Sequence, residues 1–221
     1  MPKMFEAHPN FKTPEGPKKW ETALAWFKAW GELEGEQQLA QIALSYVVAE
    51  GNLGMVKVCC DHGASLKLGY SWGITLVDFA AGKGHIRILK HLLEQEPPVV
   101  ADINRQSLRE RISAIDRASK AGHTDCIRLL HKHGADTNCR RLNRQTPAHG
   151  AAMCGHLNSL ETLAELEADL DLQDAGGKSP LDWAAYFHQT ACVKFLEKTT
   201  GKTASLEGFR SQKQKEGSGV F

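Results

Sequence analysis

The sequence predicts an all-α fold in which pairs of short helices stack into a solenoid, and three observations support it. A short pattern recurs along the chain, mostly at a period of about 33 residues. Each copy has the features of a short helix, which stops near a glycine in four of the five copies, and apolar residues at three- and four-residue spacing follow it as a second helix. Hydrophobic residues make up 42% of the chain and charged residues 24%, values typical of a folded protein.

The clearest copy of the pattern begins at Thr146 and reads TPAHGAAMCGH. The copies on either side of it begin at Ser113 and Ser179, each one period away. Two earlier copies begin at Ile42 and Thr75, and the step from Thr75 to Ser113 is longer than the others. Five copies at so regular a period indicate a repeat array.

Each first helix has residues suited to its two ends. Thr146 can cap the helix. Pro147 suits its first position because proline has no backbone N–H, and a helix forms no hydrogen bond with the N–H at that position. Gly155 is suited to a closing turn with positive φ, and small alanines allow a neighbouring helix to approach closely. His149 in this copy, and an aspartate in three others, are expected to bond the cap region. Those aspartates are Asp78, Asp116 and Asp182.

These landmarks resemble the ankyrin repeat family, with TPAH, AAMCGH and LLHKHGAD as the closest matches to its motifs. The resemblance covers about residues 37–198 and implies an ankyrin-repeat solenoid of five helix-turn-helix units. It also implies binding of protein surfaces through a concave face and loop tips, and it places Asn138 where family asparagines can be hydroxylated. The expected repeats are about 37–69, 70–107 with an insertion, 108–140, 141–173 and 174–198.

The segments outside the repeats differ in character. Residues 1–17 contain four prolines and are predicted to be an extended or disordered arm. Residues 18–36 carry an apolar stripe at helical spacing, which predicts an N-terminal capping helix; Trp26, on the flank of that stripe, is a candidate partner contact. Residues 199–221 are polar and aperiodic, and are predicted to be a flexible tail.

Composition and motifs argue against several classes of function. No apolar run is long enough for a membrane helix, and no apolar segment typical of a secretory signal follows the first residue. The six cysteines form no CxxC pair, and four of them occupy apolar helix positions, which favours buried thiols in a reduced intracellular setting, cytoplasmic or nuclear. Those four are Cys59, Cys60, Cys126 and Cys192.

Neither a metal site nor a catalytic site is expected. Equivalent histidines in neighbouring repeats, such as His123 and His156, should lie roughly 8–10 Å apart, too far to share one zinc ion. His131 and His133 are two apart on a helix and do not share a face. The chain has no GxGxxG, Walker, GxSxG or HExxH motif. We therefore expect no cofactor, no small-molecule substrate and no enzymatic activity.

The charge pattern suggests the kind of partner. Residues 103–147 carry ten Lys or Arg against four Asp or Glu, whereas both flanking regions are acidic. We expect a protein-protein interaction module, an adaptor or regulator, whose partner has an acidic patch. A structural subunit of a larger assembly is the alternative; nucleic-acid binding by the basic middle is less favoured, because that region lacks aromatic residues for base stacking. The expected contact residues are Trp72, Lys83, Arg109, Lys120, Asn143, Arg144, Gln145, Met153, Lys178, Tyr186 and Trp26.

Overall fold

A computed structural model gives the structure of the chain and describes residues 36–66, 73–95 and 102–205. The predicted arm, the predicted capping helix except its last residue, and the end of the predicted tail from residue 206 lie outside these ranges. The elements within the described ranges are α-helices, with no strand among them, which confirms the all-α prediction. These residues divide into two compact units, which are taken one at a time.

The smaller unit contains described residues 36–46 and 54–65. It holds most of α3 (Glu36–Glu50) and of α4 (Leu53–Asp61). Leu44 of α3 and Val56 of α4 are fully buried, and Cys59 of α4 is also buried. After α4 the chain turns through Gly63, whose φ is 86°, and the Ala64 N–H donates to the Cys59 carbonyl at 3.0 Å.

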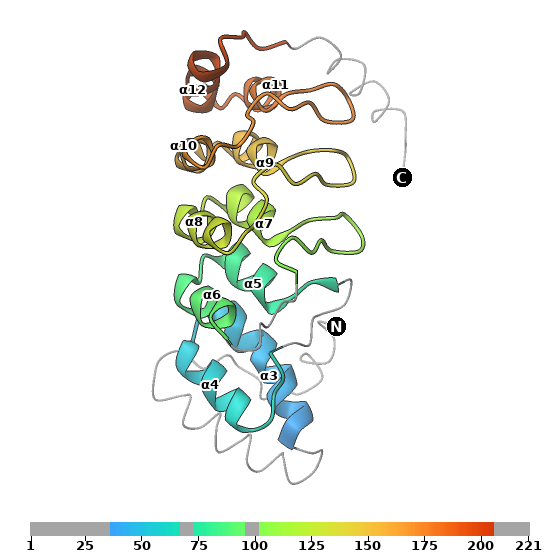
Figure 1. Cartoon of the computed structure of the whole chain (residues 1–221), viewed down its shortest axis with the longest axis vertical. Coiled ribbons are helices and arrows are strands. Elements are labelled where there is room, and N and C mark those ends of the chain that lie inside the picture. Colours follow the sequence, from blue (N-terminus) through green and yellow to red (C-terminus); the bar gives the residue numbers. More distant parts are fainter. Residues whose placement is uncertain (1–35, 67–72, 96–101, 206–221) are drawn as a thin grey trace, which may run out of the picture. The chain divides into compact units, whose positions relative to one another are not determined.

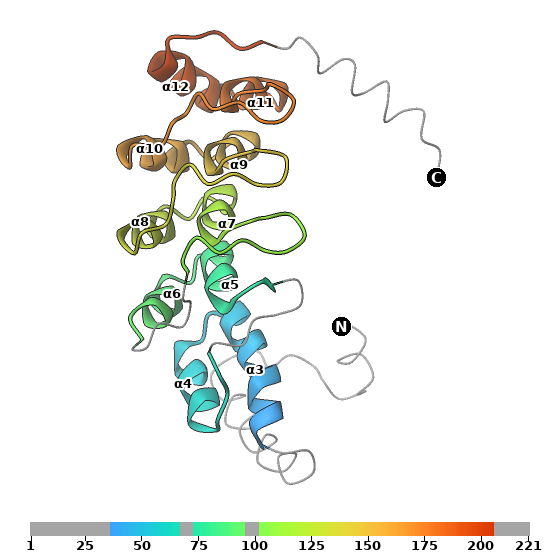
Figure 2. The ribbon, with the colours of Figure 1, turned by 45° about the vertical axis from the view of Figure 1, so that its right-hand side comes forward.

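The larger unit contains four helix pairs arranged as two columns (Figure 1). The first helices of the pairs, α5, α7, α9 and α11, pack on one another in order and are called here the first-helix column. The second helices, α6, α8, α10 and α12, form the second-helix column, and both columns remain distinct when the view is turned (Figure 2). The bounds are α5 (Leu76–Lys83), α6 (Ile86–Leu93), α7 (Ala114–Ala121), α8 (Thr124–Lys132), α9 (Pro147–Cys154), α10 (Leu157–Glu165), α11 (Pro180–Tyr186) and α12 (Thr190–Thr200).

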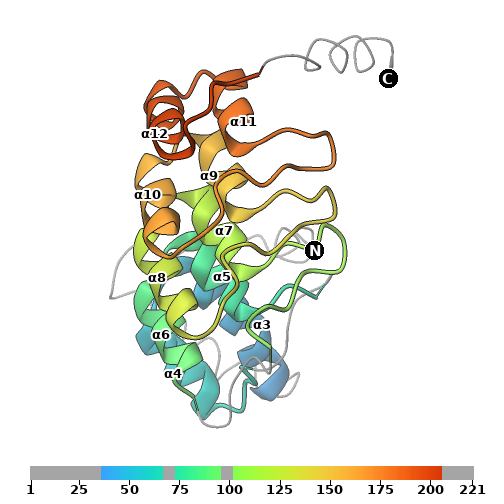
Figure 3. The ribbon, with the colours of Figure 1, turned by 45° about the horizontal axis from the view of Figure 1, so that its top comes forward.

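Hairpin-like loops precede α7, α9 and α11 and project in a common direction (Figure 3). They are called here the third finger (104–112), the fourth finger (138–145) and the fifth finger (171–178). A backbone hydrogen bond of 2.9 Å closes the tip of each finger. The N–H of the first residue donates to the carbonyl of the second in the pairs Ser107 and Ile112, Arg141 and Gln145, and Asp174 and Lys178. The third finger holds four residues inside this closure and the others hold three. The insertion predicted before repeat three therefore places one of its residues in a fingertip.

The predicted helix caps are confirmed. Asp78, Asp116 and Asp182 each accept hydrogen bonds from the backbone N–H and the hydroxyl of the N-cap residue three positions earlier, in reciprocal capping boxes. In repeat four the Thr146 N–H donates to His149 Nδ1 at 3.1 Å. The proton of His149 must then be on Nε2, which donates to the Lys178 carbonyl at 3.0 Å. His149 therefore links its helix to the fifth finger.

The turns that end the first helices use glycine for two separate reasons. Gly122 and Gly155 have φ of 84° and 75°, in the left-handed region. They also lack space for a side chain: a Cβ would lie 2.8 Å from His156 Nδ1 at Gly122, and 2.2 Å from Gln189 Oε1 at Gly155. His188 makes the corresponding turn at φ 59°, and no described helix pair follows it. The last repeat keeps the turn without the steric need for glycine.

Two histidines, His123 and His149, give the stability of the fold a pH dependence. Burial lowers the pKa of His123, and nearby His156 and His85 lower it further, while the Gly82 carbonyl raises it. Burial also lowers the pKa of His149. The unfolded chain therefore binds protons at these histidines at a higher pH than the folded chain does. As the pH falls below the ordinary histidine pKa of about 6.5, this difference favours the unfolded chain and the free energy of unfolding decreases.

We expect His123→Gln to lose less stability than the unchanged chain when the pH is lowered from about 7 to about 5.5. Glutamine is a matched replacement because Gln189 occupies the corresponding position in repeat five, where its Nε2 donates to the Met153 carbonyl at 3.5 Å. Urea unfolding at both pH values measures the difference. An equal loss in the two proteins would show that protonation of His123 does not contribute.

The end of the array extends further than predicted. Helix α12 runs to Thr200, so the tail predicted from residue 199 begins later. Ser205 N–H then donates to the Asp182 carboxylate at 2.6 Å, and Lys202 pairs with Asp171. Residues 201–205 are thus held against the fifth repeat by polar contacts.

Candidate functional site

The predicted contact residues fall into two described groups. Lys83, Lys120, Met153 and Tyr186 lie on the first-helix column, and the others lie on fingers. The finger residues are Arg109, Asn143, Arg144, Gln145 and Lys178. Trp26 and Trp72 lie outside the described residues, so their predicted roles stay predictions.

On the first-helix column, equivalent positions of successive repeats carry Lys120, Met153 and Tyr186, each one repeat period from the next. Lys120 is exposed, and Met153 and Tyr186 are half-buried. Lys83 is the last residue of α5 and is also exposed. No described residue forms a hydrogen bond or ion pair with the ammonium group of either lysine. The column therefore offers charge on α5 and α7, and apolar surface on α9 and α11.

The apolar end of this column is an aromatic cluster that the sequence reasoning identified only through Tyr186. The rings of Trp183 and Phe187 stack with centroids 5.9 Å apart, and Tyr186 meets Phe187 edge to face at 5.1 Å. Trp183 Nε1 donates to the Asp174 carboxylate at 2.8 Å, which fixes the indole against the fifth finger. Aromatic residues at helical spacing in the sequence WAAYF were the available signal.

The predicted finger residues differ in their exposure to solvent. Arg109, Asn143 and Arg144 are exposed, and Lys178 is half-buried. Gln145 is 6% exposed and closes the fourth finger through its carbonyl, which accepts from the Arg141 N–H. A partner cannot reach a side chain so enclosed, so Gln145 is left out of the surface proposed below.

Arg144 and Arg111 occupy a strained place at the tips of the fourth and third fingers. Their φ values are 61° and 54°, whereas glycine takes the corresponding turn at Gly73 and Gly177. A left-handed conformation costs a non-glycine residue roughly 1–2 kcal/mol. Two long cationic side chains are therefore held at the fingertips where glycine would be less strained.

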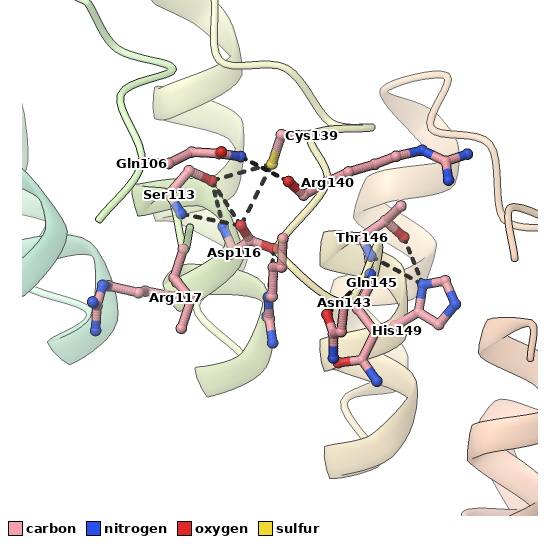
Figure 4. A network of polar contacts seen from close by, with 12 residues as sticks. Gln106, Ser113, Asp116, Arg117, Cys139, Arg140, Asn143, Gln145, Thr146 and His149 are labelled. Carbon is pink, nitrogen blue, oxygen red and sulfur yellow. Dashed lines mark hydrogen bonds and ion pairs between the residues drawn. The ribbon is translucent and has the colours of Figure 1, made fainter. Parts of the chain in front are cut away.

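A buried polar network supports the base of the fingers (Figure 4). Arg141 Nε donates to the Asp116 carboxylate at 3.1 Å, and the side chains of this pair are 10% and 0% exposed. Ser113 Oγ donates to the same carboxylate at 2.9 Å and lies 3.1 Å from Cys139 Sγ. Gly150 leaves room for the guanidinium, because a Cβ there would lie 2.9 Å from an Arg141 nitrogen. This network ties the fourth finger to α7.

Further hydrogen bonds join each finger to the next. Gln106 Nε2 donates to the Arg140 carbonyl at 3.0 Å, and the Leu142 N–H donates to the Glu110 carbonyl at 3.3 Å. The Ala175 N–H donates to the Asn143 carbonyl at 2.9 Å. Asn138 is also engaged, since its Oδ1 accepts from the Asp169 N–H at 2.9 Å. Contacts between neighbours therefore fix the position of the fingertips.

The described residues contain no group of three or more His, Cys, Asp or Glu side chains placed to hold a metal ion. Burial raises the pKa of Cys59 and of Cys126 to about 11, so both thiols stay protonated and unreactive at neutral pH. Cys59, Cys126 and Cys192 are buried as predicted, but Cys60 is only half-buried. No helix in the described ranges is long and apolar enough to cross a membrane.

Comparison with known proteins agrees with the arrangement of the helices. A family model described as ankyrin repeats (3 copies) matches residues 113–204. The chain is 26% identical over 191 residues to ankyrin repeat domain-containing protein 53 of Mus musculus, covering 83% of this chain and 38% of that protein. It is 30% identical over 125 residues to cyclin-dependent kinase 4 inhibitor B of Rattus norvegicus, covering 55% of this chain and 90% of that protein.

Other relatives are much longer than this chain. Identity to putative glutaminase 2 of Caenorhabditis elegans is 30% over 103 residues, which is 45% of this chain and 17% of that protein. The chain also spans only 38% of the first relative above. Over 58% of this chain, identity to the inactive serine/threonine-protein kinase TEX14 of Mus musculus is 32%, and the match covers 9% of that protein. The shared region with these longer proteins is thus a small part of each.

Proposed function

This chain belongs to the ankyrin repeat family, and on that premise we propose that it is a non-enzymatic module that binds a protein partner carrying an acidic patch. The binding surface comprises the first-helix column and the exposed finger residues Arg109, Asn143 and Arg144. The observation that carries the proposal is the pair of exposed lysines, Lys83 and Lys120, next to the half-buried Met153 and Tyr186 in the same column.

The mixture of charge and apolar surface favours a protein partner. Because Lys83 and Lys120 have no ion-pair partner among the described residues, neither breaks an existing ion pair there when it meets a carboxylate of another protein. Opposite charges also steer the two molecules together. Met and Tyr supply contact area of the kind found in the centres of protein interfaces, where Tyr and Trp are enriched. The aromatic cluster on α11 adds a preorganised apolar end to this surface.

The test uses peptides selected from a displayed random library panned against the full chain. We expect the double variant Lys83→Glu/Lys120→Glu to associate more slowly with these peptides and to show a weaker dependence on salt, because both lysines act mainly by steering. Biosensor kinetics at two salt concentrations measure both effects.

The matched control is Lys132→Glu/Lys194→Glu, which changes the net charge equally through exposed residues of the second-helix column. Equal slowing by both double variants would mean that only net charge matters and that the first-helix column is not the site. Wild-type kinetics in the Lys83/Lys120 variant, with its fold intact, would also reject the proposed surface.

A further inference from the structure

The structure exposes two leucines at the same place on neighbouring fingers. Leu108 is the first residue of the third fingertip (108–111) and Leu142 the first of the fourth (142–144), and they are 76% and 69% exposed. Among the described residues only one other large apolar side chain, Phe187, is classed as exposed. Scattered apolar residues on a surface need no explanation, but a pair repeated in register on adjacent fingers is a candidate contact.

Both leucines are held on a fixed backbone. A Cβ on Gly73 would lie 3.1 Å from Leu108 Cγ, so this side chain lies over the tip glycine of the preceding repeat. The Leu142 N–H is bonded to the Glu110 carbonyl of the third fingertip. Closure of each tip by its own hydrogen bonds adds rigidity. A preorganised pair loses little conformational freedom when a partner covers it.

The surroundings of the pair are cationic. The two tips carry Arg109, Arg111 and Arg144, all exposed, against the single carboxylate of Glu110. Arg111 Nε donates to Gln106 Oε1 at 2.9 Å, which holds its guanidinium near the base of the tip. The fifth fingertip is Ala175-Gly176-Gly177 and has neither a leucine nor an arginine. Among the three described fingers, the leucine and arginine surface therefore belongs to repeats three and four.

From these observations we infer that Leu108 and Leu142 are the apolar anchors of the binding surface, and that their occupant is an acidic protein segment. Such a segment has two apolar side chains about one repeat apart, roughly 8–10 Å, and carboxylates that meet Arg109 and Arg144. Aliphatic side chains cannot stack on nucleobases as aromatic ones do, which favours protein over nucleic acid. The inference rests on the proposed function and specifies the anchors and the partner's composition.

The experiment measures the affinity of library-selected peptides for the full chain and its variants. We expect the selected peptides to combine Asp or Glu with Leu, Ile or Phe, and each of Leu108→Ser and Leu142→Ser to weaken binding by about tenfold or more. Ala175→Ser, at the same place in the fifth finger, is the matched control and should bind as the unchanged chain does. Arg144→Gly should weaken binding while raising the melting temperature, because it removes a cation and relieves the left-handed strain.

Each contrary outcome is distinct. Retention of full affinity by Leu108→Ser/Leu142→Ser, together with loss in Lys83→Glu/Lys120→Glu, would overturn the anchors and leave the proposed function standing. Failure of the library to yield any binder would count against both. Tighter binding of a mixed-sequence oligonucleotide, insensitive to the leucine changes, would overturn the protein partner. Self-association that the leucine changes abolish, seen by sedimentation, would replace that partner with a second copy of the chain.

Discussion

Replacing Arg141 with leucine is expected to lower the free energy of unfolding by about 3–5 kcal/mol, because it leaves the carboxylate of Asp116 buried without its cation. Asp116 is fully buried and keeps its bonds from Ser113, but these do not neutralise the charge. The change also removes the tie between the fourth finger and α7. Denaturant unfolding of the full chain, followed by far-ultraviolet circular dichroism, measures the loss.

Arg128→Ala is the matched control for this substitution. Arg128 of α8 pairs with Glu165 of α10, so this pair also joins repeats three and four, but its side chains are about half exposed. Solvent-exposed pairs contribute about 0–1 kcal/mol, so the change should have a small effect. A similar loss in both variants would show that burial of the Arg141 pair has no special weight.

Gly122→Ala is expected to be the second large effect. The left-handed turn costs alanine roughly 1–2 kcal/mol, and crowding against the ring of His156 adds about 1–3 kcal/mol. The Cβ would lie 2.8 Å from Nδ1 and 3.1 Å from Cγ of that ring, so the whole imidazole must shift. Thermal and urea unfolding should both show the change, and amide exchange should show its largest loss at the junction of repeats three and four.

His188 supplies the control for the glycine argument. It makes the same kind of turn at φ 59° without a described repeat above it. His188→Ala should therefore change stability little, and His188→Gly should raise it by up to about 1–2 kcal/mol through relief of backbone strain. If Gly122→Ala were as mild as His188→Ala, the ring stacked on Gly122 would not constrain that position.

The periodic features of the fold could be predicted from the sequence because they depend on local residue chemistry repeated at a fixed interval. Thr75 with Asp78, and Thr146 with His149, identify the helix starts, and Gly122 and Gly155 identify the helix ends. The structure adds why His188 is acceptable where its counterparts are glycines. The end of α12 was placed too early, because the polar residues after Lys198 gave no apolar period to follow.

The proposed binding surface could be predicted less fully from the sequence. Lys83 and Lys120 could be placed by their distance from the turn glycines, and both are exposed. Gln145 was expected at the surface, but it lies at the closing hydrogen bond of the fourth finger and is buried. The repeat spacing placed Leu142 at a loop tip, but the exposure of Leu108 in the same register is seen only in the structure.

The central claim is that a protein partner binds the first-helix column and the fingertips, and amide chemical-shift mapping on the full chain with a selected acidic peptide tests it most directly. The account predicts shifts at residues 108–111 and 142–144 and at Lys83, Lys120 and Met153, with α6, α8, α10 and α12 little changed. Shifts confined to those second helices, or to residues outside both surfaces, would contradict it.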